Sequence, residues 1–238
     1  MRKAIPSARL IQSGDEMKRA ISLIFALLLF FSLALNAEAK IGFSHGERAG
    51  KKIALSFDDG PHPTFTPKIL SLLEKHGIKA TFFMIGCNVA TYPSVARAVA
   101  NAGHEIGNHT YTHPHMKQIS LNVLREEIQK TEDILLQNGI AKPKLFRPPE
   151  GFRSEEQVKT LEGFGYQTVI WSLDTHDWQG RPTDEIVSVV LEGIQGGDIL
   201  LFHDYTSRHN TTITALERLI PKLLEDGYEF VTVSELMC

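Results

Sequence analysis

Carboxylates and histidines follow two strand-like segments of this sequence, and their spacing could support metal-assisted hydrolysis. Asp58 and Asp59 come directly after the apolar run KIALSF, and His109 and His113 follow the short run at 105–108. His-x-x-x-His spacing places two imidazoles on one side of a helical turn, which is common among metal ligands. With Asp59 as third ligand, a His2Asp site would leave one position open for water. Two plainer interpretations stay open: an Asp-Asp-Gly-Pro stretch is typical of a turn, and the histidines could lie on the surface.

Candidates for proton transfer and substrate contact follow three later segments. Arg147 ends one strand-like run, Asp174 and Asp177 follow VIWSL, and His203 ends the apolar run DILLF. A histidine at a strand end is often structural, but beside a metal and several aspartates it becomes a candidate general acid. Trp178 fits either the core or a surface that stacks on a sugar ring.

His115 is the histidine most easily mistaken for a metal ligand. It lies two residues after His113, on the far side of a proline. Positions i and i+2 do not share a helical face, so we predict that His115 is not a ligand.

Strand-like and helical segments alternate through the chain and predict an α/β fold with parallel strands. The expected strands cover 52–57, 80–85, 105–108, 144–147, 167–173, 198–202 and 230–233. The expected helices cover 66–76, 93–102, 121–137, 154–163, 183–192 and 211–224, with Thr183 as the cap of the fifth. This alternation fits a small or incomplete barrel or an open doubly wound sheet, in one domain. The carboxyl ends of parallel strands open onto one face, so the polar clusters should converge there.

The first 39 residues resemble a secretory signal peptide and are set apart from the domain at 40–238. Lys18 and Arg19 precede an apolar run at 20–35, and an Ala-x-Ala pattern at 37–39 follows it. This layout predicts cleavage after Ala39 and a secreted or cell-envelope protein. An uncleaved membrane anchor is the alternative, although the run is at the short end for a spanning helix.

Composition narrows the classes of partner. The 238 residues carry a formal net charge of -3, with 42% hydrophobic and 22% charged residues. A chain without a basic excess is not expected to bind nucleic acid or an anionic membrane surface, and nothing in the sequence indicates a protein partner. The sequence has ten histidines and only two cysteines, so imidazole and carboxylate are the expected metal ligands, and thiolates are not. Cys87 and Cys238 could form one disulfide in an oxidising compartment, which the sequence leaves open.

Five motifs together resemble the polysaccharide deacetylase family, the NodB-homology domain of the family 4 carbohydrate esterases. The resemblance covers residues 51–236 and implies a distorted (β/α) barrel with about seven parallel strands in a single domain. The motifs, in family order, are Ser56-Phe57-Asp58-Asp59-Gly60-Pro61, Asn108-His109-Thr110-Tyr111-Thr112-His113-Pro114, Phe146-Arg147-Pro148-Pro149, Asp174-Thr175-His176-Asp177-Trp178 and Leu201-Phe202-His203.

This resemblance implies a role for each candidate residue. The implied metal ligands are Asp59, His109 and His113. The implied catalytic residues are Asp58 as general base, Arg147 as the group that orients it, His203 as general acid and Asp177 as its partner. The implied substrate-binding residues are Leu201 and Trp178, which would line the groove around the acetyl methyl group.

Glu150 marks a departure from the family. The family usually has tyrosine at this position, and the backbone N–H of that tyrosine serves the oxyanion. A backbone donor survives the change to glutamate, but the groove becomes more acidic. Glu150 is therefore included with the substrate-binding residues, and the change bears on substrate preference.

The implied reaction is metal-dependent hydrolysis of N-acetyl groups on a glycan. Zn²⁺ is the metal most consistent with a His2Asp site that has an open position, and Co²⁺, Ni²⁺ or Mn²⁺ are possible. Peptidoglycan is the first choice of substrate and a chito-oligosaccharide the second. The alternatives are an acetyl-ester esterase on xylan-type polysaccharide and a catalytically inactive glycan-binding protein.

Overall fold

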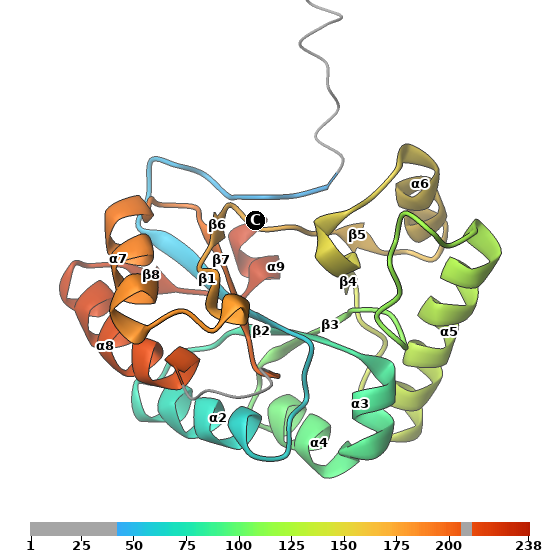
Figure 1. Cartoon of the computed structure of the whole chain (residues 1–238), viewed down its shortest axis with the longest axis horizontal. Helices are drawn as coiled ribbons and strands as arrows, with labels where there is room; N and C mark the ends of the chain where they lie inside the picture. The colour runs from blue at the N-terminus through green and yellow to red at the C-terminus, as the bar shows by residue number, and fades with distance from the viewer. Residues whose placement is uncertain (1–41, 206–210) are drawn as a thin grey trace, which may run out of the picture. The chain divides into compact units, whose positions relative to one another are not determined.

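Strand β1 lies between β2 and β7 in a curled parallel sheet whose order is β5-β4-β3-β2-β1-β7-β6, with the short β8 paired to the start of β1 (Figure 1). The computed structural model describes residues 42–205 and 211–238, so the predicted signal segment lies outside the described residues. The strands are β1 (Lys52–Asp58), β2 (Thr81–Met84), β3 (Glu105–Asn108), β4 (Leu145–Phe146), β5 (Gln167–Thr168), β6 (Leu173–Asp174), β7 (Ile199–His203) and β8 (Glu229–Phe230).

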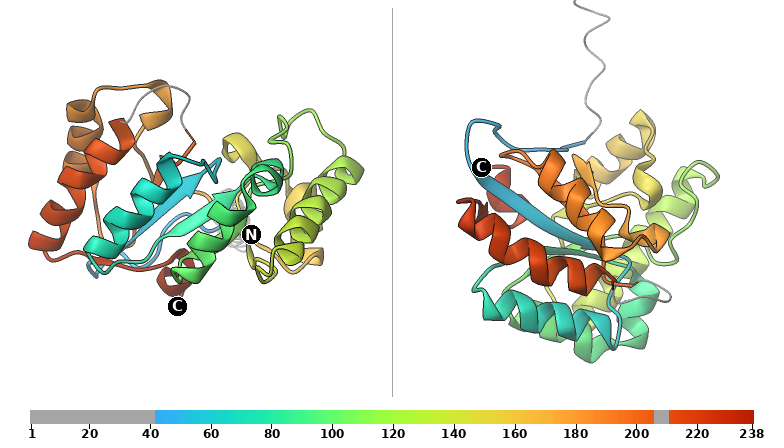
Figure 2. Two further views of the ribbon diagram at one scale, coloured as in Figure 1. Left: turned by 90° about the horizontal axis from the view of Figure 1, so that it is seen from below. Right: turned by 60° about the vertical axis from the view of Figure 1, so that its left-hand side comes forward.

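Most of the helices cover the outside of the sheet, whereas the last helix packs on its inner face. Figure 1 shows them in an arc from α7 and α8 through α2 to α5 and α6, and Figure 2 shows α2 and α8 side by side. No helix in the described ranges is long and apolar enough to span a membrane. The helices are α2 (Phe65–Lys75), α3 (Gly86–Thr91), α4 (Pro93–Asn101), α5 (Leu121–Gln137), α6 (Glu155–Gly163), α7 (Thr183–Gly193), α8 (Thr211–Glu225) and α9 (Val233–Leu236), with 3-10 turns η1 (Pro149–Gly151) and η2 (Asp177–Gln179).

The α/β fold with seven parallel strands in a single domain is confirmed. Each strand pairing within the sheet is parallel. The sheet curls, but β5 and β6 at its two ends do not pair with each other. The barrel is therefore incomplete.

Alternation along β1 determines which side chains face the site. Leu55 and Phe57 pack toward the helices, where the Phe57 ring stacks on Phe82 at 4.9 Å between centroids. Ser56 and Asp58 point to the other side of the strand, where both contact Arg147. Successive side chains of a strand face opposite sides of the sheet, so one strand supplies both core and active-site surface.

The expected strand at 167–173 is wrong. Its residues form two short strands, β5 and β6, at opposite ends of the sheet. Between them, Ile170 donates its N–H to Phe43 O at 2.8 Å, and Ser172 donates to Ile199 O at 3.1 Å. The segment changes hydrogen-bond partners because it crosses the open side of the curled sheet, which an apolar run does not reveal.

Four smaller features also differ from the sequence analysis or were left open by it. The last expected strand, 230–233, is shortened to β8, because Thr232 begins helix α9 with a capping box that includes Glu235. Helix α3 was not expected. Helix α7 begins at Thr183, but the capping position belongs to Pro182 and no side chain caps the helix. Cys87 and Cys238 are both free thiols, so they do not form a disulfide.

Candidate active site

Strand register places the candidate residues side by side. Asp58 at the end of β1 pairs with His203 at the end of β7, and Asn108 of β3 pairs with Phe146 of β4. The residues that follow these last two, His109 and Arg147, are therefore neighbours. The expected convergence of polar clusters at the carboxyl ends of the strands follows from this register.

A cavity of about 530 Å³ opens at this edge of the sheet. Its volume lies within the usual range for small-molecule sites. Of the ten predicted site residues, Arg147 and Asp177 do not line it. They are buried behind it at 0% and 1% exposure. The lining consists of Asp58, Asp59, His109, His113, Glu150, Trp171, Asp174, Trp178, Leu201 and His203.

Three potential metal donors meet in the cavity. Asp59 Oδ1 lies 3.5 Å from His109 Nε2 and 3.4 Å from His113 Nε2. One donor atom from each residue falls within 4.8 Å of the others. Asp59 Oδ1 is buried and has no hydrogen-bond partner among the described residues. A buried carboxylate oxygen without a partner, facing two imidazole nitrogens, fits a divalent cation such as Zn²⁺.

Hydrogen bonding orients His109 for this role. Its Nδ1 lies 2.7 Å from the backbone O of Arg147. A carbonyl only accepts, so Nδ1 carries a proton and Nε2 is the ring nitrogen that faces Asp59. The imidazole is held at 1% exposure, which leaves it little freedom to turn.

The expected helical turn at His109–His113 is wrong. This segment is a loop in which Thr110 and His113 have φ values of 69° and 56°. The two rings nevertheless lie 5.1 Å apart, centroid to centroid. Their proximity depends on contacts of the loop with the rest of the protein.

Charges in the site shift the pKa values of the donors. Burial raises the pKa of Asp59, but His109, His203 and His113 outweigh burial and bring it to about 2. Burial lowers the pKa of His113, and the charge of His109 lowers it further. Asp59 is thus ionised at pH 7, and the lowered pKa of His113 favours its neutral form; these are the states that bind a metal. Burial lowers the pKa of His109, but Asp58 and Asp59 outweigh burial and raise it, so a bound metal would displace the proton from His109 Nε2.

Arg147 holds Asp58 from within the sheet. Its Nη1 donates to Asp58 Oδ1 at 2.7 Å and to Ser56 Oγ at 2.8 Å. The guanidinium carbon lies 4.0 Å from the ring centroid of Phe83. Asp58 is only 3% exposed, and a buried carboxylate of this kind requires a paired cation.

Asp177 holds His203 in the same way. Its Oδ1 lies 2.8 Å from His203 Nδ1, and its Oδ2 accepts the His203 backbone N–H at 2.9 Å. Burial lowers the pKa of His203, but the hydrogen bond and charge of Asp177, with smaller contributions from Asp58 and Asp59, raise it to about 9. His203 is therefore protonated at neutral pH, with Nε2 left to donate.

Glu150 and Trp178 lie at the rim of the cavity. Glu150 is at φ 57° in η1, and its Oε1 lies 2.7 Å from His115 Nδ1. His115 is thus the partner of Glu150 and does not belong to the donor cluster. Trp178 is 55% exposed, whereas Leu201 is buried at the cavity wall. An exposed indole at a cavity rim suits stacking on a sugar ring.

Sequence reasoning missed several contributors. Trp171 and Asp174 line the cavity, although Trp171 fell inside an expected strand and Asp174 was named at a strand end and in the fourth motif without a role. Asp204, next to His203, is 1% exposed, and burial raises its pKa to about 7. A Cβ on Gly60 would lie 2.2 Å from the carboxylate oxygens of Asp204. Glycine is thus required where the turn after Asp59 passes this buried side chain.

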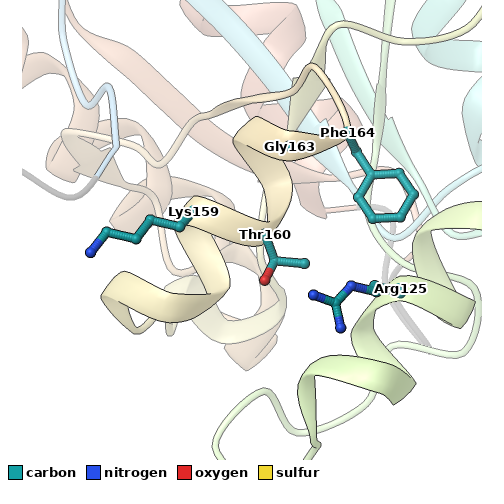
Figure 3. A pocket seen from close by; sticks show the side chains of 5 residues that line it. All are labelled: Arg125, Lys159, Thr160, Gly163 and Phe164. Atoms are coloured by element: carbon teal, nitrogen blue, oxygen red, sulfur yellow. The ribbon is translucent and has the colours of Figure 1, made fainter.

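A second hollow, between α5 and α6, has a different character. Figure 3 shows Arg125, Lys159, Thr160 and Phe164 around it. Its volume is about 400 Å³. The lining is cationic and aromatic, so it lacks the metal donors and the acid–base pair of the strand-end cavity.

Comparison with known proteins decides the family. The sequence pattern that defines polysaccharide deacetylases matches residues 45–169. The chain belongs to the polysaccharide deacetylase family. It is 42% identical over 189 residues to a peptidoglycan-N-acetylglucosamine deacetylase of Bacillus cereus. The matched region covers 79% of this chain and 88% of that protein.

Other family members differ in length and in named substrate. A chitooligosaccharide deacetylase of Sinorhizobium fredii is 35% identical over 74% of this chain and 87% of its own. A peptidoglycan-N-acetylglucosamine deacetylase of Listeria monocytogenes is longer, and the chain spans 39% of its length, at 36% identity over 79% of this chain.

Solved structures include both an enzyme and a pseudoenzyme. A peptidoglycan N-acetylglucosamine deacetylase in complex with a naphthalenyl N-oxidanyl-benzamide superposes with a TM-score of 0.79 at 38% identity, covering 83% of this chain and 92% of that one. A CE4 family pseudoenzyme from Bacillus anthracis superposes with a TM-score of 0.76 at 35% identity, covering 81% and 67%. Membership in the polysaccharide deacetylase family therefore does not by itself establish catalysis, and the side chains must be considered.

Proposed function

We propose that this protein is a secreted, metal-dependent deacetylase that hydrolyses N-acetyl groups of a glycan, with peptidoglycan as the first candidate substrate. The observation that carries the proposal is the complete set of groups around one cavity. Asp59, His109 and His113 would hold the metal, and the Asp58–Arg147 and His203–Asp177 pairs flank them. A protein that only binds glycan needs neither a base nor an acid, so this set argues against the inactive alternative.

Amide hydrolysis explains why both pairs are present. An amide is a weak electrophile and an amine a poor leaving group, so both a general base and a general acid are needed. When bound, a divalent cation such as Zn²⁺ would activate water and polarise the acetyl carbonyl. Asp58 would accept the proton of the attacking water, while the hydrogen bond from Arg147 keeps its carboxylate in place.

His203 would complete the reaction. Its Nδ1 proton is held by Asp177, so Nε2 is the atom that would donate a proton to the departing nitrogen. A His203 pKa of about 9 keeps this nitrogen protonated at neutral pH. An ester releases an alkoxide, which depends less on such a donor than an amine does. Because Asp177 holds His203 in its protonated form, the site favours N-deacetylation over acetyl-ester hydrolysis.

The substrate proposal draws on the relatives and on the N-terminal pattern. Both peptidoglycan and chito-oligosaccharide deacetylases are among the relatives, and the B. cereus protein matches over most of both chains. The basic, apolar and Ala-x-Ala pattern of residues 18–39 supports action outside the cytoplasm, where peptidoglycan is found.

Acetate release from purified glycans tests the proposed function. The panel contains peptidoglycan, chito-oligosaccharides and acetylated xylan, each assayed with the metal-free protein and with added Zn²⁺, Co²⁺, Ni²⁺ or Mn²⁺. We expect release from an N-acetylated glycan only when metal is present. Release from acetylated xylan alone would favour the esterase, and release from none would favour the glycan-binding alternative.

The alkaline limb of the pH–rate profile should depend on Asp177. We expect kcat/KM to fall above about pH 9, where His203 loses its proton. In Asp177→Asn, the carboxylate that raises the His203 pKa is absent, so the limb should move by about two units toward the ordinary histidine value near 6.5. Acetate release is measured from pH 5 to 10.

The control for this pH experiment is Asp184→Asn, which removes an exposed carboxylate paired with Arg218. Its profile should match that of the unmodified protein. An unchanged alkaline limb in Asp177→Asn would mean that His203 is not the group whose ionisation limits the rate.

Glu150→Gln should change substrate preference. The carboxylate is half-exposed at the cavity rim and repels anionic groups, an effect that salt weakens. We expect kcat/KM for a carboxylate-bearing glycan, relative to a neutral chito-oligosaccharide, to rise by about two- to fivefold at low salt, as for a modest surface charge interaction. His115→Gln removes the imidazole that contacts Glu150 but keeps the carboxylate, so it should leave the ratio close to that of the unmodified protein. An unchanged ratio in Glu150→Gln would indicate a solvated glutamate without contact to substrate.

A further inference from the structure

Glu127 is a buried carboxylate that accepts three hydrogen bonds from the loop between the two histidines. Its Oε2 accepts the backbone N–H groups of Tyr111 at 2.8 Å and Thr112 at 2.7 Å, and its Oε1 accepts the Thr112 hydroxyl at 3.0 Å. Glu127 lies on α5 and is 7% exposed. A carboxylate is costly to bury unless hydrogen bonds satisfy it, and here all three come from one loop.

Helix α3 binds two backbone carbonyl groups of the same loop. Gly86 N–H donates to Thr110 O at 2.9 Å, and Cys87 N–H donates to Tyr111 O at 2.9 Å. The N–H groups of Tyr111 and Thr112 therefore point to α5, and the carbonyl groups of Thr110 and Tyr111 point to α3. Figure 1 shows α3 and α5 next to each other, as their contacts require.

Close packing leaves this loop little room to shift. A Cβ on Gly86 would lie 2.5 Å from the Tyr111 ring and 2.6 Å from Thr131 Oγ1. Thr131 Oγ1 in turn donates to the backbone O of Glu127 at 3.0 Å. The loop, α3 and α5 thus form one packed unit centred on the Glu127 carboxylate.

The loop needs this support because its conformation is unfavourable by itself. Thr110 and His113 both adopt left-handed φ values, which non-glycine residues seldom take without support from the surrounding structure. Local hydrogen bonds, such as His113 N–H to Thr110 Oγ1 at 3.1 Å, do not connect the loop to the rest of the fold. Glu127 and helix α3 make that connection.

We propose that Glu127 is a positioning residue for the metal site, which keeps His113 Nε2 at the distance from His109 Nε2 and Asp59 Oδ1 that a bound cation requires. The inference rests on the metal site of the proposed function but not on the substrate. It predicts that the three hydrogen bonds matter for metal affinity, and that the negative charge of Glu127 does not.

Zn²⁺ affinity, measured by calorimetry on the metal-free full chain without substrate, tests the inference. Glu127→Met keeps the side-chain length and removes every acceptor, so affinity should fall by about 10–100-fold, as expected for loss of an outer hydrogen-bond partner. Glu127→Gln keeps an oxygen for the two N–H groups, and the Thr112 hydroxyl can accept from its amide. Its affinity should stay within about threefold of the unmodified protein.

The matched control is Glu126→Gln, because Glu126 is the adjacent, exposed carboxylate on α5 and pairs only weakly with Lys130 at 3.7 Å. It should leave Zn²⁺ affinity unchanged. Thermal unfolding of the metal-free variants, and the visible spectrum of the Co²⁺ forms, separate lost stability from altered coordination. A folded Glu127→Met with unchanged affinity and Co²⁺ spectrum would overturn the inference.

Glu127→Asp serves if Glu127→Met does not fold. Its shorter side chain cannot reach both N–H groups and the hydroxyl without moving the loop, so it should lower affinity although it keeps the charge. Unchanged affinity in Glu127→Asp would also overturn the inference. Because no glycan is used, these results are independent of whether the proposed deacetylase activity is found.

Discussion

His113→Ala is expected to abolish metal binding and glycan deacetylation together, whereas His115→Ala keeps both. His113 is the better ligand to remove, because its side chain is 34% exposed and its loss leaves no buried hole, whereas His109 is 2% exposed. Losing one of three protein donors should reduce affinity by more than the roughly 10–100-fold that follows loss of an outer partner. Metal content after dialysis and acetate release are measured on the same samples.

His115→Ala is the matched control, because it removes an imidazole two residues away that contacts Glu150 instead of Asp59. Circular dichroism establishes that both variants fold. Depletion of metal in His115→Ala, with full occupancy in His113→Ala, would show that the assigned donor set is wrong.

Asp58→Asn is expected to keep its metal yet lose about 10²–10⁴-fold in kcat, the usual contribution of a general base. The amide matches the carboxylate in shape, and its oxygen can still accept from Arg147, so the cavity should persist. It cannot take up a proton from water at neutral pH. Removing one charge from a buried pair is also destabilising, by about 3–5 kcal/mol. Turnover is therefore measured below the unfolding transition, with metal occupancy determined on the same sample.

Ser56→Ala separates the two consequences of Asp58→Asn, which are the loss of the general base and the loss of stability. It removes another hydrogen-bond partner of Arg147 and leaves the Asp58 carboxylate in place. We expect a loss of stability of about 1 kcal/mol and little change in kcat. Normal turnover by fully metal-loaded Asp58→Asn would remove Asp58 from the role of base.

The family and the strand–helix alternation could be read from the sequence because both depend on local patterns. The run KIALSF predicts β1, and the structure has this strand at Lys52–Asp58. The five motifs indicated the polysaccharide deacetylase family, which the comparisons confirm. The helix expected at 154–163 is α6, which begins with a capping box formed by Ser154 and Gln157.

Other features depended on the tertiary structure. The helical turn predicted for His109–His113 follows from spacing, but the structure forms a loop because Glu127 and α3 bind its backbone groups. Likewise, apolar residues at 167–173 favour a strand, but the segment must cross between the two ends of an open sheet. Hydrogen bonds to distant residues override local preference in both places.

The sequence by itself determined which residue types follow each strand, and therefore the candidate donors, base and acid. Only the tertiary structure decided their partners: Arg147 reaches Asp58 across 89 positions, and Asp177 reaches His203 across 26. The physical reason is the register of the parallel strands, which brings separate strand ends to one edge of the sheet. Spacing in the chain carries no information on that register, whereas burial and pKa values follow directly from it.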